Sequence, residues 1–70
     1  MQQIMITFKN SKALKNFCQY RQPQNSYAFT SIRLLCDYHL NPHGIQNDFI
    51  HIATTYYNAD TYIIPDNDDY

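Results

Sequence analysis

The chain has 70 residues, of which 44 % are apolar, with seven tyrosines, four phenylalanines, one glycine and a formal net charge of −1. This length and composition predict one folded domain and argue against a disordered chain. No stretch is apolar enough for a transmembrane helix, and residues 1–8 lack the features of a signal peptide. We therefore expect a small soluble cytoplasmic protein, in the host-cell cytoplasm if the chain is phage-encoded.

The small net charge conceals a strong segregation of charge along the chain. All five basic side chains lie in the first half, at Lys9, Lys12, Lys15, Arg21 and Arg33. All six acidic side chains follow them, at Asp37, Asp48, Asp60, Asp66, Asp68 and Asp69. Such a pattern bears on partners and on the orientation of docking more than on fold.

The first two predicted elements are a strand and a helix. Residues 3–8 alternate apolar and more polar side chains, which predicts a strand with one buried face. Asn10 and Ser11 are N-cap candidates for a helix over residues 11–21, which Pro23 ends. The helical spacing predicts an inner face and an opposite, polar and basic outer face. The inner face is Leu14, Phe17, Cys18 and Arg21, and the outer face is Lys12, Lys15, Asn16 and Gln19.

Residues 27–40 are open to two interpretations. Apolar or small side chains at every second position favour a strand. Fourteen residues is, however, far longer than the usual strand of about five or six. Thr30 as an N-cap and Pro42 beyond the end favour a helix over about residues 31–41. We favour the helix, and the strand remains the alternative.

The last third predicts a hairpin. Residues 48–57 are rich in β-branched and aromatic side chains, residues 58–60 suit a turn, and residues 61–64 suit a returning strand. Because there is only one glycine, turns that need a positive φ must rely on Asn and Asp. Pro65 ends the second strand.

These elements predict an α+β fold. The order is β-α-α-β-β, or β-α-β-β-β if the middle segment is extended, with helices on one face of a three- to four-stranded, mainly antiparallel sheet. We expect a single compact domain over residues 1–65 and an acidic tail over residues 66–70.

A metal site is the first chemical hypothesis. Cys36, His39 and His43 have a C-x2-H-x3-H spacing, with Cys18 as a fourth ligand. The spacing fits only if residues 31–41 are helical, and the paired ligands of most zinc sites are missing. We therefore expect no metal and two free cysteine thiols.

Catalytic patterns are also missing from the sequence. A cysteine with His39 or His51 as base has no nucleophile elbow, Gly-rich loop or telling carboxylate spacing around it. We expect neither an enzyme nor a cofactor.

Two surfaces are candidates for binding. The acidic, tyrosine-rich half suits a protein interface, because tyrosine offers a large contact area at little entropic cost. Its candidate residues are Tyr56, Tyr57, Tyr62, Asp60, Asp66, Asp68 and Asp69. The alternative is nucleic-acid binding through the basic first helix. Its candidate residues are Lys9, Lys12, Lys15, Tyr20 and Arg21.

These observations predict a small non-enzymatic inhibitor that covers a surface of a larger protein or nucleoprotein complex. Size and composition suggest a phage or mobile-element anti-defence protein, of which anti-CRISPR proteins are one class. Direct nucleic-acid binding by a small regulator is the alternative, and a pI near 6.2 argues against it. The oppositely charged halves also allow a homodimer. No membrane partner is expected.

Overall fold

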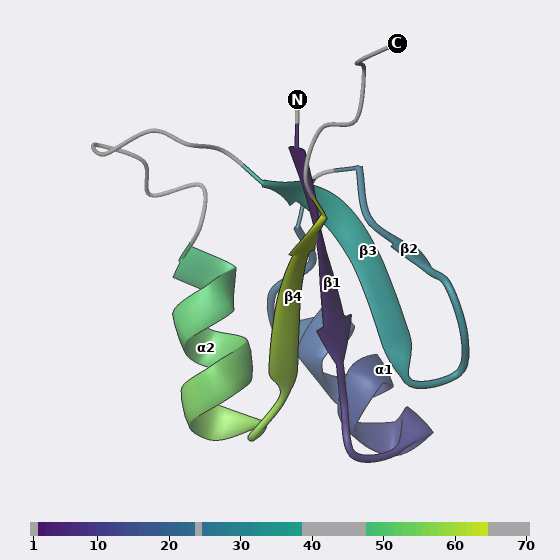
Figure 1. The fold of residues 1–70 in the computed structure, drawn as a ribbon. Coiled ribbons are helices and arrows are strands. Elements are labelled where there is room, and N and C mark those ends of the chain that lie inside the picture. The colour runs from purple at the N-terminus through teal and green to yellow at the C-terminus, as the bar shows by residue number, and fades with distance from the viewer. Residues whose placement is uncertain (1, 24, 39–47, 65–70) are drawn as a thin grey trace, which may run out of the picture.

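The computed structural model describes residues 2–23, 25–38 and 48–64. Within them the elements follow in the order β1 (Gln2–Thr7), α1 (Ser11–Tyr20), β2 (Tyr27–Ala28), β3 (Arg33–Tyr38), α2 (Asp48–Tyr56) and β4 (Asp60–Ile64). The strands form one antiparallel sheet in the order β2-β3-β1-β4 (Figure 1). The α+β prediction is confirmed. The element order differs from both predicted orders and is that of the split β-α-β, or ferredoxin-like, arrangement.

β1 is the predicted first strand, and it lies at the centre of the sheet. It pairs with β3 on one side and with β4 on the other. Ile4 lies opposite Cys36 and Ile6 opposite Leu34, and all four side chains are buried. Successive side chains in a strand point to opposite faces, so this alternation defines a buried face and an outer face of the sheet.

α1 begins and ends close to the predicted residues. The Asn10 side chain accepts a hydrogen bond from the backbone N–H of Ala13 at 2.8 Å, which caps the N-terminus. At the other end the Arg21 N–H donates to the Phe17 carbonyl at 2.7 Å. Leu14 and Phe17 are buried, as the helical spacing predicted. The polar and basic residues predicted for the outer face are exposed.

The helix predicted over residues 31–41 is wrong, because β3 occupies residues 33–38 and pairs with β2 across a turn; residues 39–41 lie outside the described residues. Thr30 does bond to backbone N–H groups, as an N-cap would, but it lies in the turn between the strands. Its hydroxyl accepts from Ile32 at 3.3 Å and from Arg33 at 3.1 Å. The turn divides the long alternating segment into two short strands, which removes the objection based on length.

The strand predicted over residues 48–57 is also wrong, because this segment forms α2. Phe49 and Ala53 are buried four residues apart, on one side of the helix. The Thr54 hydroxyl donates to the Ile50 carbonyl at 2.9 Å, one turn back. Burial of this face outweighs the strand preference of the β-branched residues, which is a weak local effect.

β4 confirms the predicted strand over residues 61–64, but the predicted hairpin is wrong. β4 pairs with β1 and not with the segment before it. The turn from α2 into β4 is held by the Ala59 N–H, which donates to the Ala53 carbonyl at 3.0 Å. Asn58 in this turn and Asn25 before β2 have positive φ, as expected of a chain with so little glycine.

A single core joins the two helices to the buried face of the sheet, so both helices lie on one side of it. Figure 1 shows α1 behind the sheet and α2 alongside β4. The rings of Phe8, Phe17 and Tyr57 meet in the core, with centroids 5.2 to 6.2 Å apart. Neither helix is long and apolar enough to cross a membrane, among the residues described. The predicted tail, residues 66–70, lies outside those residues.

Candidate functional site

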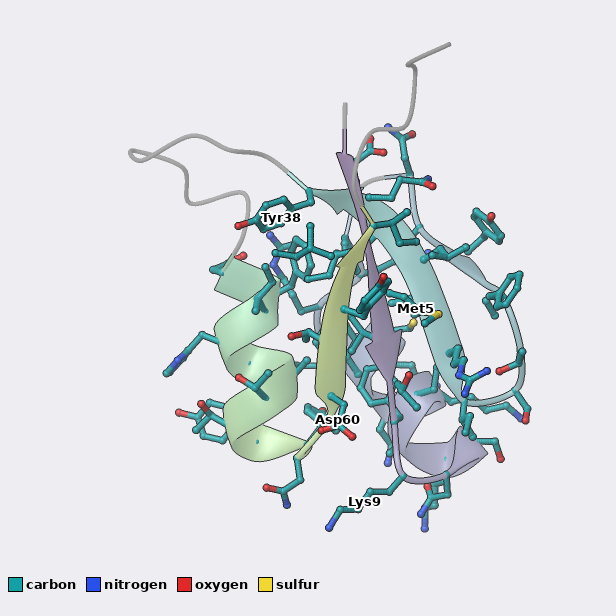
Figure 2. All side chains as sticks on the ribbon, in the orientation of Figure 1. Met5, Lys9, Tyr38 and Asp60 are labelled. Carbon is teal, nitrogen blue, oxygen red and sulfur yellow. The ribbon has the colours of Figure 1, made fainter. Side chains whose placement is uncertain are left out.

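The face of the sheet turned away from the helices, which we call the open face, carries one continuous row of large side chains. The strand register places Tyr27, Leu35, Met5 and Tyr62 side by side across the four strands. We call these residues the tyrosine row. Figure 2 shows Met5 on the near side of the sheet, while α1 lies on the far side. The row therefore crosses the middle of a face that the helices do not cover.

The tyrosine row is exposed at its ends and shielded at its centre. Tyr27 is 54 % exposed and Tyr62 is 60 % exposed, whereas Leu35 is only 7 % exposed. Directly opposed side chains in an antiparallel sheet have Cβ atoms about 4.5–5.5 Å apart, so Tyr27 and Met5 flank Leu35 on its two sides. The result is an apolar strip with a tyrosine ring at each end.

Charged and polar side chains border this strip on both sides. One neighbouring row is formed by Arg33, Thr7 and Asp60, and the other by Asp37 and Gln3, with the apolar Ile64 at its end. The Asp37 carboxylate accepts a hydrogen bond from the Asn25 side chain at 2.8 Å. In Figure 2 Asp60 lies at the start of β4, at one end of the sheet. An apolar centre with a polar rim is the usual anatomy of a protein interface.

The predicted acidic, tyrosine-rich surface is divided between different parts of the molecule. Asp60 and Tyr62 lie on the open face, as part of β4. Tyr56 ends α2 and is 71 % exposed. Tyr57 is half-buried, with its ring 5.5 Å from that of Phe17, and so belongs largely to the core. The remaining predicted residues lie outside the described part of the chain, at Asp66, Asp68 and Asp69.

Sequence reasoning missed three of the four residues in the tyrosine row. Tyr27, Leu35 and Met5 come from different strands, and only the register brings them together with Tyr62. The alternation within residues 27–40 could have indicated that Tyr27 and Leu35 lie on strands. The helical interpretation of that segment did not use it.

The predicted basic surface keeps most of its residues exposed, on the helix side of the sheet. The exposed side chains are those of Lys9, Lys12, Lys15 and Tyr20. Arg21 is engaged elsewhere, because its guanidinium lies 2.6 Å from the carboxylate of Asp48, the first residue of α2. This hydrogen-bonded partner lowers the pKa of Asp48. Arg21 therefore joins the end of α1 to the start of α2.

Both cysteines carry free thiols, as expected. Cys36 is fully buried, and burial, with a smaller contribution from Asp37, raises its pKa to about 12. Burial also raises the pKa of the half-buried Cys18. Nucleophilic and metal-binding cysteines need the opposite shift, toward the thiolate. These environments favour inert thiols.

The metal hypothesis loses its structural premise. The ligand spacing required a helix through Cys36, and this residue lies in β3. The other two residues of the motif, His39 and His43, lie outside the described residues. Within the described ranges, no three His, Cys, Asp or Glu side chains come together as metal ligands.

Comparison with models of known protein families, with curated proteins and with solved structures found no match for this chain. The ferredoxin-like arrangement of the elements carries many unrelated functions, so it does not indicate one by itself. Any functional argument must therefore start from the surface features of this molecule.

Proposed function

We propose that this protein is a small non-enzymatic binding module that docks its open face on a larger protein or nucleoprotein complex and inhibits it by covering a working surface. The observation that supports this proposal is the tyrosine row. Tyr27 and Tyr62 offer rings and hydroxyl groups to a partner, and both keep more than half of their surface accessible.

The composition of the strip suits recognition of a protein. Tyrosine side chains have few rotatable bonds, so they lose little entropy when a partner immobilises them. Met5 at the centre of the row is unbranched and adapts its shape to the surface it meets. The rim charges of Arg33, Asp37 and Asp60 would set the orientation of docking more than its strength.

The dimensions of the open face limit how it binds. Four strands about 4.8 Å apart and five residues of about 3.3 Å each outline roughly 240 Å². A standard protein interface buries about 800 Å² on each partner. A partner must therefore also contact neighbouring surface, and Phe29, two residues after Tyr27 along the chain, is 56 % exposed.

The kind of target is proposed on separate grounds. An anti-defence role of the anti-CRISPR kind, in the cytoplasm of a host cell, rests on the size and composition of the chain alone. The docking surface is proposed independently of that role, and it is tested without assuming it.

The test is an affinity pull-down of the tagged protein from extract of its native host, with identification by mass spectrometry. The wild type is compared with Tyr27→Ala/Tyr62→Ala, which removes the two exposed rings of the open face. The matched control is Lys12→Glu/Lys15→Glu, which alters the exposed face of α1. We expect a stoichiometric protein partner with the wild type and the lysine variant, and its loss with the tyrosine variant, with or without nuclease.

A partner retained by the tyrosine variant would show that the open face is not the docking surface. An enzymatic assay or a binding assay of the purified partner then tests inhibition directly. If the protein binds the partner without lowering its activity, the proposed binding function is retained and the proposed inhibition is refuted.

Nucleic-acid binding through α1 is the second candidate, because Lys12 and Lys15 on the helix and Lys9 just before it are all exposed. Three phosphate contacts would give a slope of about −2 to −3 in log affinity against log salt concentration. Loss of binding in Lys12→Glu/Lys15→Glu, with no loss in the tyrosine variant, would favour this function over the first.

A further inference from the structure

We propose that a pocket lined by three tyrosines of the helix layer, Tyr20 in α1 and Tyr56 and Tyr57 at the end of α2, binds the guanidinium group of an arginine on a partner's peptide segment. The pocket is lined by Tyr20, Tyr56 and Tyr57 and has a volume of about 390 Å³. Ligand sites in proteins usually span about 300–1,000 Å³, so this pocket lies at the small end of that range. The lining residues belong to the two helices and the residue after α2, so this proposal does not depend on the docking role proposed for the open face.

The rings of the pocket differ in how firmly they are held. Tyr57 meets Phe8 and Phe17 edge-on, with centroids 6.2 Å and 5.5 Å away, and this packing fixes its orientation. Tyr56 makes a similar edge contact with His51 at 6.4 Å. The Tyr57 side of the pocket is therefore held by the core, whereas Tyr20 and Tyr56 are exposed to the solvent.

The surroundings of the pocket favour a cation. The face of an aromatic ring carries partial negative charge, which attracts ammonium and guanidinium groups. Tyr56 is the last residue of α2, and the C-terminal end of a helix carries partial negative charge. α2 has no basic residue in its last turn to neutralise this potential.

The protein's own arginine at this position is turned away from the pocket. Arg21 follows Tyr20 directly, but its guanidinium donates to the Asp48 carboxylate at 2.6 Å and 3.2 Å. Arg21 is not among the residues that line the pocket. None of the residues that line the pocket is therefore a lysine or an arginine.

Arginine fits this pocket better than lysine does. A planar guanidinium stacks flat on an aromatic ring and still points its N–H groups outward, where tyrosine hydroxyl oxygens accept hydrogen bonds. The ammonium group of lysine is compact and strongly hydrated, so it gains less from the same rings.

The test is an NMR titration of the full isotopically labelled chain with the tripeptide acetyl-Gly-Arg-Gly-amide. The control peptide has citrulline, the neutral isostere, in place of arginine. We expect saturable shifts at Tyr20, Tyr56 and Tyr57 with a Kd in the millimolar range, and binding at least about threefold weaker with citrulline.

Variants locate the binding. Tyr56→Leu should abolish the shifts, Tyr56→Phe should retain them, and Tyr62→Leu on the open face should leave them unchanged. Tyr56 and Tyr62 are both exposed, so the spectra of the free variants should keep the dispersion of the folded protein. Equal binding of both peptides, or shifts confined to the aspartates, would overturn the proposal. Either result leaves the pull-down test of Tyr27 and Tyr62 unaffected, so failure of one proposal is distinguishable from failure of the other.

Discussion

The buried thiol of Cys36 should make the folded protein lose stability at alkaline pH. Its pKa in the folded protein is about 12, against an ordinary value of 9.0. In the unfolded chain the thiol loses its proton near the ordinary value, so between pH 9 and 12 the native state holds more protons. Stability then falls as the pH rises. The contribution of the thiol is fully present below pH 9 and is lost progressively above it.

The size of the loss follows from the same two values of the pKa of Cys36. Each pH unit above 9.0 costs about 1.4 kcal/mol, so the loss is about 1.4 kcal/mol at pH 10 and about 2 kcal/mol at pH 10.5. A domain of 70 residues is typically stable by only about 4–10 kcal/mol. The buried thiol should therefore remove a substantial part of the stability under mildly alkaline conditions.

The assay is urea unfolding of the wild type and Cys36→Ala between pH 7.5 and 10.5, with a reductant present. The other ionisable groups are the same in both proteins, so their contributions cancel in the comparison. The cavity left by the substitution lowers the stability of Cys36→Ala by an amount that does not depend on pH. We expect the advantage of the wild type to shrink by about 2 kcal/mol over this range. Parallel pH profiles would refute the reasoning.

Three further predictions concern stability. Phe17→Ala should lower the free energy of unfolding by about 3–5 kcal/mol, because Phe17 is fully buried; a loss below 1 kcal/mol in urea unfolding would contradict this packing. Asn10→Ala should cost about 1 kcal/mol and Asn10→Asp much less, as measured by thermal melts; equal losses would mean that the cap contributes nothing. Asp48→Asn should cost less than about 1 kcal/mol at neutral pH, since its pair with Arg21 is exposed. Because this pair lowers the pKa of Asp48, the difference should vanish as the pH falls below 3.8, and a difference that persists at pH 2 would exclude the ion pair as its cause.

The elements that could be predicted from the sequence are those with strong local signals. β1 alternates over its whole length, and α1 has a capping asparagine and a clear inner face. The segment 48–57 contains a helical spacing in Phe49, Ala53 and Tyr57, but its β-branched and aromatic residues are typical of a strand and led to the strand prediction. Burial against the rest of the protein determines that this segment is a helix, and such tertiary contacts are not visible in a single sequence.

The candidate site was predicted only in part for a different reason. Tyr62 and Asp60 were predicted as site residues because the C-terminal half is rich in tyrosine and aspartate. Their neighbours on the open face depend on which strands pair, and strand order is a property of the whole chain. The predicted hairpin would have placed Tyr62 beside residues that now lie in α2. Without the order β2-β3-β1-β4, the tyrosine row cannot be assembled from its parts.

The central position of β1 has a consequence for biosynthesis. β1 is made before either of its neighbours, and β4 follows only after every other described element has left the ribosome. Until then one edge of β1 has no strand beside it, and such edges are sites of aggregation. Pairing across so long a stretch of chain also slows folding, because the loop must close before its contacts form. Truncated translation products that stop before β4 should therefore be the species most in need of chaperones.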